Sequence, residues 1–203
     1  GVVVVTLAFL PQLAWNNALW GFQSQVYFAV LFSVLALRWL GAEHMTRARL
    51  IVGFLSGIAA QLAMSAGAFV PLAVLALTGF RMVERRRCIA KDASVALSAI
   101  VLLILVLALR VHVPEHELLQ ARSAAHFFGV LLRITAWPHD SQPLAAFALN
   151  APLVIVVMLR LLRKRTTSGD GEDFALLLGG WTLAAAAAVA WFRGGSGEFY
   201  FGV

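Results

Sequence analysis

The longest run of uncharged hydrogen-bonding and aromatic side chains lies at residues 15–25, between two apolar segments. It contains two tryptophans, two asparagines and two glutamines. Amides near hydrocarbon are costly unless they form hydrogen bonds, so this many of them favours a polar pocket. In such a pocket the amides would bond sugar hydroxyls or a phosphate, and an aromatic face would stack on a sugar ring. The predicted substrate contacts are Trp15, Asn17, Trp20, Gln23 and Gln25.

Tryptophans are also common where a helix enters a membrane, and this aromatic belt is the alternative for Trp15 and Trp20. It explains the amides less well, because a span can begin without them. Gln23 and Gln25 fall in the first turn of the next predicted helix and point about 200° apart, so both cannot face lipid comfortably.

Arg193 is a further candidate, because it stands directly after an apolar segment and before several glycines. Its guanidinium and the backbone N–H groups of Gly194, Gly195 and Gly197 would hold a phosphate at the membrane surface. The alternative is an arginine that anchors the helix end by extending its charge to the interface.

No metal site is predicted. His112 and His116 have the spacing of helical metal ligands, but Pro114 between them breaks the geometry. Cys88 is the only cysteine, which excludes an intramolecular disulfide and a cysteine-based metal cage. The sequence has no P-loop, Gly-x-Ser-x-Gly, His-Glu-x-x-His or Cys-x-x-Cys pattern. No predicted span carries a charge near its centre, which weighs against an ion-coupled transporter.

The composition is that of a polytopic membrane protein. Hydrophobic residues make up 61% of the chain and charged residues 13%, against about 45–50% and about 25% in soluble domains. The net charge of +6 does not indicate a nucleic-acid partner. The basic residues stand in short clusters between apolar runs, where they orient helices in a lipid bilayer.

Apolar segments along the whole chain predict an all-α transmembrane bundle of about six to seven spans. Residues 1–11 resemble the end of a truncated first span, because residues 1–12 would form only about 18 Å of helix where a bilayer core requires about 30 Å. The chain is therefore expected to be an internal fragment that forms a single transmembrane domain over residues 1–203. Further single spans are predicted at residues 22–40, 92–110, 144–162 and 174–192.

Residues 50–83 are too long for one span and have basic residues on both flanks. If both flanks lie on the same side of the membrane, the segment must cross twice as a short helical hairpin. The predicted break is Ser65-Ala66-Gly67, and Pro71 would stand near the start of the returning helix, where proline is tolerated. The alternative is one long tilted helix, which would place one arginine cluster on the wrong side.

An amphipathic helix is predicted within the polar connection at residues 111–143. Pro114 and the acids Glu115 and Glu117 are typical of a helix start. Apolar residues then recur at helical spacing as far as Leu132, and Trp137-Pro138 would end the helix. Such a helix would lie on the outer membrane surface.

Positive charge predicts the orientation. The three loops assigned to the cytoplasmic side and the helix ends that flank them carry 12 of the 16 Lys and Arg residues, and the other side carries four. This places residues 12–25, 111–143 and 193–203 on the outer face, which in a bacterium is the periplasmic side of the inner membrane.

The stretch at residues 15–25 that leads into a span resembles a loop of bacterial integral-membrane glycosyltransferases of the C superfamily. The comparison is to poorly characterised members that are similar to dolichyl-phosphate-mannose-protein mannosyltransferases. The hairpin with Ser65-Ala66-Gly67 at its turn is similar to their paired central helices. Ala136-Trp137-Pro138 and the glycine-rich residues 193–197 also resemble the family.

The resemblance implies an enzyme that transfers a sugar from a polyprenyl-phosphate-linked donor to an acceptor on the outer face of the membrane. It carries over Trp15, Asn17, Trp20, Gln23 and Gln25 as pocket residues and Arg193 as a phosphate contact. The family's catalytic acid stands in a loop that would precede Gly1, and none of this chain's acids matches its position. No cofactor is indicated beyond the lipid-linked donor.

Two other functions stay open. A flippase or other transporter of lipid-linked glycans would require a hydrophilic path through the bundle. A non-catalytic membrane scaffold would require neither a path nor a reactive site.

Overall fold

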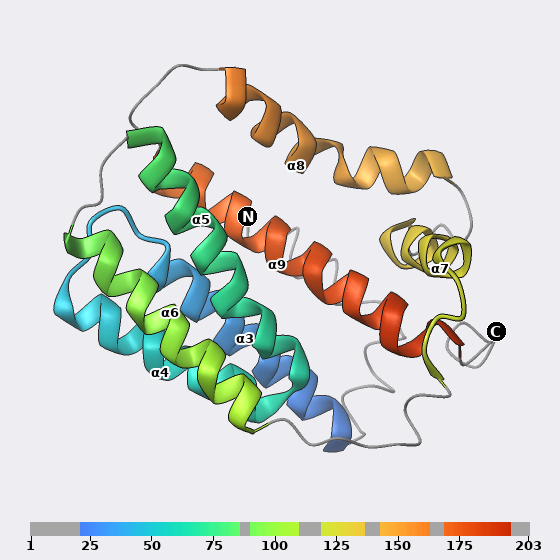
Figure 1. Cartoon of the computed structure of the whole chain (residues 1–203), viewed down its shortest axis with the longest axis horizontal. Coiled ribbons are helices and arrows are strands. Elements are labelled where there is room, and N and C mark those ends of the chain that lie inside the picture. Colours follow the sequence, from blue (N-terminus) through green and yellow to red (C-terminus); the bar gives the residue numbers. More distant parts are fainter. Residues whose placement is uncertain (1–20, 86–89, 110–118, 137–142, 163–168, 196–203) are drawn as a thin grey trace.

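The computed structural model describes residues 21–85, 90–109, 119–136, 143–162 and 169–195, and in these ranges it is helical without strands, which confirms the predicted all-α class (Figure 1). The predicted truncated span at residues 1–11, and Trp15, Asn17 and Trp20, lie outside the described residues. The helices in chain order are α3 (Gly21–Leu40), α4 (Arg47–Ala63), the 3₁₀ turn η1 (Ser65–Ala68), α5 (Phe69–Arg85), α6 (Ala90–Ala108), α7 (Ala124–Ala136), α8 (Pro143–Leu162) and α9 (Asp170–Arg193).

Four of the described helices are long and apolar enough to cross a membrane, which supports a membrane protein. They are η1 with most of α5 (Ser65–Glu84), α6, most of α8 (Pro143–Arg160) and α9. Within the described residues, α3 and α7 contribute shorter apolar helices, at Ser24–Leu40 and Ala124–Ala136. The prediction of six to seven spans therefore stays a prediction beyond these four.

The predicted break between residues 50 and 83 is confirmed. Helix α4 ends at Ala63, and η1 places Ser65-Ala66-Gly67 in the turn before α5. The chain reverses direction here, so the end of α5 returns to the connection between α3 and α4. Arg81, near the end of α5, donates to the carbonyl of Gly41 in that connection. Helix α6 packs against both α4 and α5 and so fills the space beside the pair.

Helix directions alternate so that three connections meet at one end of the bundle. This charged end comprises residues 40–47 and the described helix ends that flank the other two connections, which are the end of α5, the start of α6, the end of α8 and the start of α9. The Lys91 Nζ donates to the Glu43 carbonyl over 2.8 Å, and the Glu43 N–H donates to Asp170 Oδ1 over 2.7 Å. These contacts join the three connections, at the left of Figure 1. The far end comprises η1, α7 and residues 191–195.

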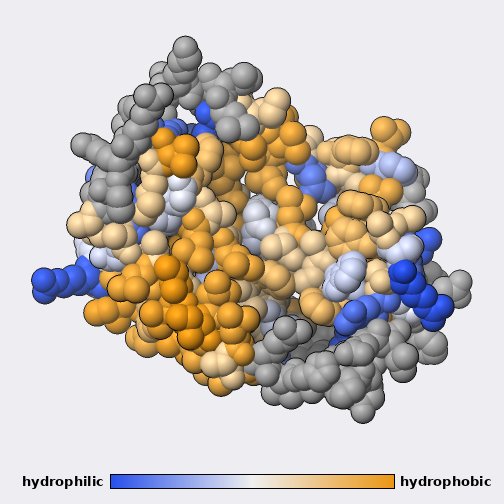
Figure 2. Space-filling model, in the orientation of Figure 1, coloured by the Kyte–Doolittle hydropathy of each residue, from blue (hydrophilic) through white to orange (hydrophobic). Residues whose placement is uncertain are grey.

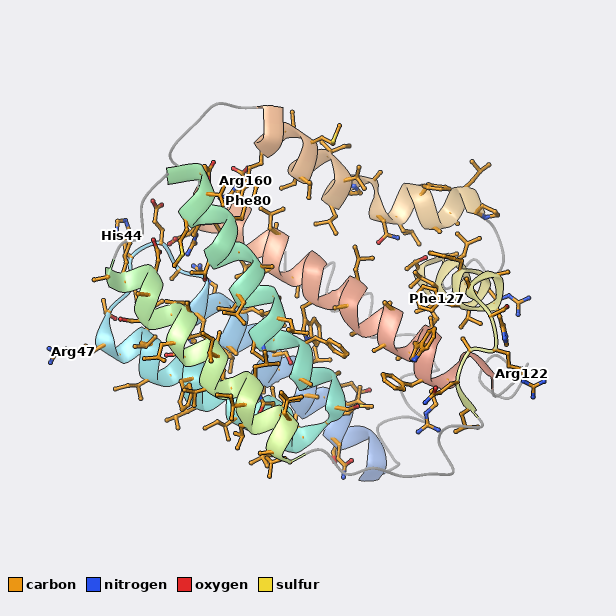
Figure 3. All side chains as sticks on the ribbon, in the orientation of Figure 1. His44, Arg47, Phe80, Arg122, Phe127 and Arg160 are labelled. Carbon is orange, nitrogen blue, oxygen red and sulfur yellow. The ribbon has the colours of Figure 1, made fainter. Side chains whose placement is uncertain are left out.

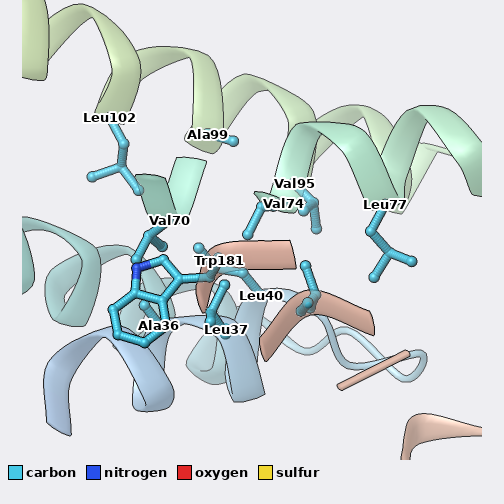
Figure 4. Close-up of a cluster of buried hydrophobic side chains, with 11 residues drawn as sticks. Ala36, Leu37, Leu40, Val70, Val74, Leu77, Val95, Ala99, Leu102 and Trp181 are labelled. Atoms are coloured by element: carbon cyan, nitrogen blue, oxygen red, sulfur yellow. The ribbon is translucent and has the colours of Figure 1, made fainter. Parts of the chain in front are cut away.

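The core lies where α3, α5, α6 and α9 meet (Figure 4). It consists of apolar side chains that these helices present to one another. The Trp181 indole closes this core from α9 and donates its N–H to the Ala66 carbonyl over 3.0 Å, which ties α9 to the hairpin turn. The other buried members are Ala36, Leu37, Leu40, Val70, Val74, Leu77, Val95, Ala99, Leu102 and Leu177.

Helix α7 is shorter than the predicted amphipathic helix. Its described part starts at Ala124, because the Ser123 Oγ accepts from the His126 N–H over 3.1 Å and caps the first turn. Residues 121–123 are not helical, so a continuous helix from Pro114 is wrong. The described part of α7 extends to Ala136, and the predicted end at Trp137-Pro138 lies outside the described residues. Figure 1 shows α7 almost end-on, so it runs across the direction of α8 and α9.

The outer surface of the bundle is largely apolar, as lipid contact requires. Helix α8 exposes Leu144 and Phe147 at 82% and 72% of their area, and α6 exposes Leu97 and Leu107. In Figure 2 hydrophobic residues cover most of the visible middle of the bundle, and hydrophilic ones gather mainly near its margins. This distribution is expected when the solvent around the middle of the helices is hydrocarbon.

Gly67→Ala is expected to destabilise the hairpin. A Cβ at this position would lie 2.3 Å from the carbonyl carbon and oxygen of Ala60, which are backbone atoms and cannot rotate away. The expected loss is about 1–3 kcal/mol in the free energy of unfolding, measured by denaturant titration of the purified protein in detergent.

Gly79→Ala is the matched control, because nothing lies within 4 Å of its added Cβ. As a glycine inside a helix, it should gain roughly 0.5–1 kcal/mol on this change. Equal stabilities of the two variants would contradict the close approach of η1 to α4.

Candidate functional site

A buried carboxylate near the start of α9 holds the charged end together. Asp173 is 1% exposed and pairs with arginines from two other helices. Its Oδ2 accepts from Arg81 Nε over 3.1 Å and from Arg81 Nη2 over 2.5 Å. Its Oδ1 accepts from Arg160 Nη1. One side chain thereby links α5, α8 and α9.

Arg160 extends this cluster to a second acid. Its Nη2 donates to Glu84 Oε2 over 3.0 Å, and its guanidinium carbon lies 4.8 Å from the centre of the Phe80 ring. Figure 3 shows Arg160 and Phe80 beside each other at the charged end, where α8 approaches α5. The ionic cluster thus comprises Arg81, Glu84, Arg160 and Asp173.

Local sequence explains why these charges meet. Arg81 and Glu84 lie in the last turns of α5, Arg160 lies near the end of α8, and Asp173 lies in the first turn of α9. Because these ends converge, charges that flank apolar segments in the sequence become neighbours in space. The position of Asp173 in a first turn is also favourable for a carboxylate, since the helix dipole places partial positive charge there.

The ionic cluster is charge-balanced, with two guanidinium and two carboxylate groups. Burying a lone charge in an apolar interior costs several kcal/mol, and close oppositely charged partners offset this cost. The cluster therefore fixes the relative positions of α5, α8 and α9 and holds no excess charge of its own.

An apolar groove begins beside Arg160. It has a volume of about 360 Å³ and lies between α5, α8 and α9. Among the described residues that line it, Arg160 is the only charged one. The walls are hydrocarbon and can hold an aliphatic chain, which needs no hydrogen bonds. The lining consists of Leu72, Ala73, Ala76, Leu77, Phe80, Val157, Arg160, Leu176, Leu177, Gly180 and Ala184.

Two neighbouring glycines on α9 give this region its shape. A Cβ at Gly179 would lie 2.4 Å from Leu153 Cδ1, so the missing side chain lets α8 approach α9 closely. Nothing lies within 4 Å of a Cβ added at Gly180, which lines the groove. Gly179 therefore brings the helices together and Gly180 leaves space between them.

The far end brings two of the predicted outer segments together. The Ala121 N–H donates to the Trp191 carbonyl over 2.8 Å, and the Phe127 ring packs edge-on against the Trp191 ring at 6.1 Å. A Cβ at Gly195 would lie 2.2 Å from the Gln120 carbonyl oxygen, so this glycine permits close packing of the two segments. Figure 3 shows Phe127 and Arg122 at this end, opposite His44 and Arg47.

The predicted substrate contacts are only partly described. Gln23 and Gln25 lie in the first two turns of α3, as predicted, and the Gln25 side chain is exposed. Arg193 is the last residue of α9 and is half-buried. It lies two residues after Trp191, so the two side chains leave the helix on opposite sides. Their roles in substrate binding stay predictions.

Gln61 forms a hydrogen bond between two helices. Its Nε2 donates to the Leu102 carbonyl over 3.2 Å, which joins α4 to α6. Gly57 lies one turn earlier and accommodates Leu102, whose Cδ1 would be 2.7 Å from an added Cβ. The glutamine thus supports helix packing, as expected of an amide within a span.

Sequence reasoning missed the ionic cluster. Arg81 and Arg160 counted only among the basic residues that flank the predicted cytoplasmic loops, and Asp173 was given no role. The structure corrects this, because all three are buried within helices. The sequence signal for the cluster was the presence of acids close to basic helix ends. It does not show which charges pair, because the partners Arg81 and Asp173 are 92 residues apart along the chain.

Within the described ranges, no group of three or more His, Cys, Asp and Glu side chains is placed to hold a metal ion. Comparisons of the chain with protein-family models, curated proteins and solved structures find no match. The assignment to a glycosyltransferase family therefore rests on the sequence resemblance alone.

Asp173→Asn is expected to be strongly destabilising. The change leaves the Arg81 and Arg160 guanidinium groups buried with one negative charge fewer. Breaking a buried pair in this way costs about 3–5 kcal/mol. Thermal unfolding of the purified protein in detergent measures the loss.

Glu172→Gln is the control, because it removes the same charge from the same helical turn at a half-buried position. It should change stability by less than about 1 kcal/mol. A loss for Asp173→Asn no larger than that of the control would contradict the bridging role of Asp173.

Proposed function

We propose that this protein is a membrane-embedded glycosyltransferase that takes a sugar from a polyprenyl-phosphate-linked donor. The acceptor would receive the sugar at the outer face, which in a bacterium is the periplasmic side of the inner membrane. The far end of the bundle is the proposed place of transfer, and the bilayer and the lipid-linked donor are the proposed partners.

The observation that carries this proposal is the contact between two predicted outer segments at the far end. Residues 119–136 pack against residues 191–195 through the Ala121–Trp191 hydrogen bond and the Phe127–Trp191 ring pair. Helix α3 also begins at this end, since it contacts η1. The described candidates Gln23 and Gln25, near the start of α3, and Arg193, at the end of α9, are therefore carried by helix ends on the same side of the bundle.

Exposed aromatic surface at this end suits a ligand that is both polar and apolar. Trp191 is 46% exposed and Phe128 is 64% exposed. Such rings can stack on a sugar or lie at the level of the lipid headgroups. Arg193 would bind the donor phosphate, with Gln23 and Gln25 of α3 as sugar contacts. No acid of the chain is assigned as the catalytic group.

The groove gives less support to a glycan transporter. A transporter of sugars needs a polar path, and the described residues that line the groove are apolar except for Arg160. Membrane scaffolding is the remaining alternative, and it would leave the far end without a substrate.

Arg193→Gln is expected to impair sugar transfer. In cells that lack the protein, the lipid-linked donor should accumulate, as measured by mass spectrometry of extracted lipids. The wild-type protein should reverse this accumulation. Loss of a charge-assisted bond of about 1.5–3 kcal/mol predicts that Arg193→Gln lowers the transfer rate by about tenfold or more. The rate is measured in proteoliposomes with a panel of polyprenyl-phosphate-linked hexoses and pentoses.

Arg47→Gln is the matched control, because it removes an exposed arginine from the opposite end of the bundle. It should leave the transfer rate within about twofold of wild type, since this end is not the proposed place of transfer. If no donor accumulates in cells without the protein, and no donor in the panel is consumed by the wild type, the enzyme proposal fails.

A further inference from the structure

The groove between α5, α8 and α9 has the size and the walls for one hydrocarbon chain. Its volume of about 360 Å³ falls within the usual range of about 300–1,000 Å³ for ligand pockets. Along α5 it extends from Leu72 to Phe80, a rise of about 12 Å. The described residues that line it are apolar except for Arg160, so an occupant must be apolar over most of this length.

The groove opens on the apolar outer surface of the bundle. Leu72 and Val157 line it and are nevertheless 44% and 38% exposed. Gly180, which also lines it, is exposed as well. The neighbouring residues Met158 and Leu183 continue this surface, and all five belong to helices that are long and apolar enough to cross a membrane. A lipid chain can therefore enter sideways from the bilayer core.

Arg160 makes one end of the groove polar without giving it a net charge. Its Nη1 donates to Asp173 and its Nη2 donates to Glu84, while Asp173 also accepts from Arg81. Two guanidinium and two carboxylate groups therefore balance within the ionic cluster. A charged ligand group beside Arg160 would find no opposite surplus in this cluster.

Burial determines which ligand group can lie at this end. Arg160 is 5% exposed and Asp173 is 1% exposed, so a group placed beside them loses most of its hydration. Removing a charge from water costs far more than removing a hydroxyl group, and the balanced cluster does not offset the larger cost. Arg160 is also the only polar side chain among the described lining residues, which favours a single small polar group.

We propose that the groove binds a long-chain alcohol, an uncharged lipid of one hydrocarbon chain, with its hydroxyl group beside Arg160. The apolar walls hold the chain, and the balanced ionic cluster disfavours a charged end. This site is separate from the far end, where sugar transfer is proposed. It does not depend on that proposal.

Oleyl alcohol, oleic acid and oleylamine share one hydrocarbon chain and test the selection against charge. Radiolabelled oleyl alcohol is bound to the purified protein in detergent at about pH 9, where the carboxylate and the ammonium are both charged. Unlabelled oleyl alcohol should displace it at roughly tenfold lower concentration than either charged competitor, which corresponds to about 1.4 kcal/mol. Equal competition by oleic acid or oleylamine would overturn the proposal.

Gly180→Leu tests the location. Its side chain enters the groove without a clash, because nothing lies within 4 Å of the added Cβ. It should lower oleyl alcohol binding by about tenfold, since filling a pocket removes the ligand's contacts. Gly79→Leu on α5 is the control. Its Cβ is equally unobstructed and the residue is not among those that line the groove, so binding should be unchanged. Equal binding by the two variants would show that the alcohol lies elsewhere.

Glu84→Gln tests the role of charge balance. It removes the carboxylate that pairs with the Arg160 Nη2 and leaves the ionic cluster with one net positive charge. Oleic acid should then compete about tenfold better than it does on the wild type, because its carboxylate meets an opposite charge in a poorly hydrated site.

Glu172→Gln is the matched control, because it removes the same charge from the half-buried start of α9 outside the ionic cluster. Competition by oleic acid should stay as in the wild type. If Glu84→Gln and Glu172→Gln give the same competition, the cluster does not select the end of the ligand and the proposal fails.

Polyprenyl phosphate provides the remaining arm, and it should compete no better than oleic acid. If it displaces oleyl alcohol more strongly than unlabelled oleyl alcohol does, and Gly180→Leu abolishes this, the groove belongs to the sugar donor and the alcohol assignment fails. Because no sugar is transferred in these measurements, their failure leaves the glycosyltransferase proposal standing.

Discussion

The packing of this bundle depends on one buried carboxylate. Asp173 joins Arg81 of α5 to Arg160 of α8 while it sits in the first turn of α9. Buried charges are tolerated only when close partners balance them, so each of these residues fixes where the other two must lie. Helix α8 shows the consequence most clearly. It exposes most of its apolar surface, and Arg160 joins its end to α5 and α9.

The two ends of the bundle differ in chemistry, and this difference organises both proposals. The charged end gathers the ionic cluster and one end of an apolar groove. The far end gathers exposed aromatic rings, close glycine packing and Arg193. An uncharged hydroxyl end of a lipid suits the first environment. The second suits a ligand with a sugar ring and a phosphate, which is why sugar transfer is proposed there.

Much of the fold could be predicted because its signals are local. Apolar length gave the helices, and basic flanks together with Ser65-Ala66-Gly67 gave the hairpin. The start of α7 was predicted less accurately than the hairpin, because Pro114 and two acids resemble a helix start more closely than Ser123 does. The ionic cluster depends on how helix ends converge, and no spacing in the sequence shows that Asp173 faces Arg81. Of the predicted substrate contacts, the described residues include Gln23, Gln25 and Arg193. The structure places the two glutamines on α3 and the arginine on α9.

The orientation of the two ends across a membrane is the claim on which the account most depends, and thiol labelling in intact cells tests it most directly. In a Cys88→Ser background, single cysteines replace His44 at the charged end and Arg122 at the far end, both of which are exposed. A membrane-impermeant maleimide should label Arg122→Cys in intact cells and His44→Cys only after lysis. Labelling of both positions from the same side would contradict the account.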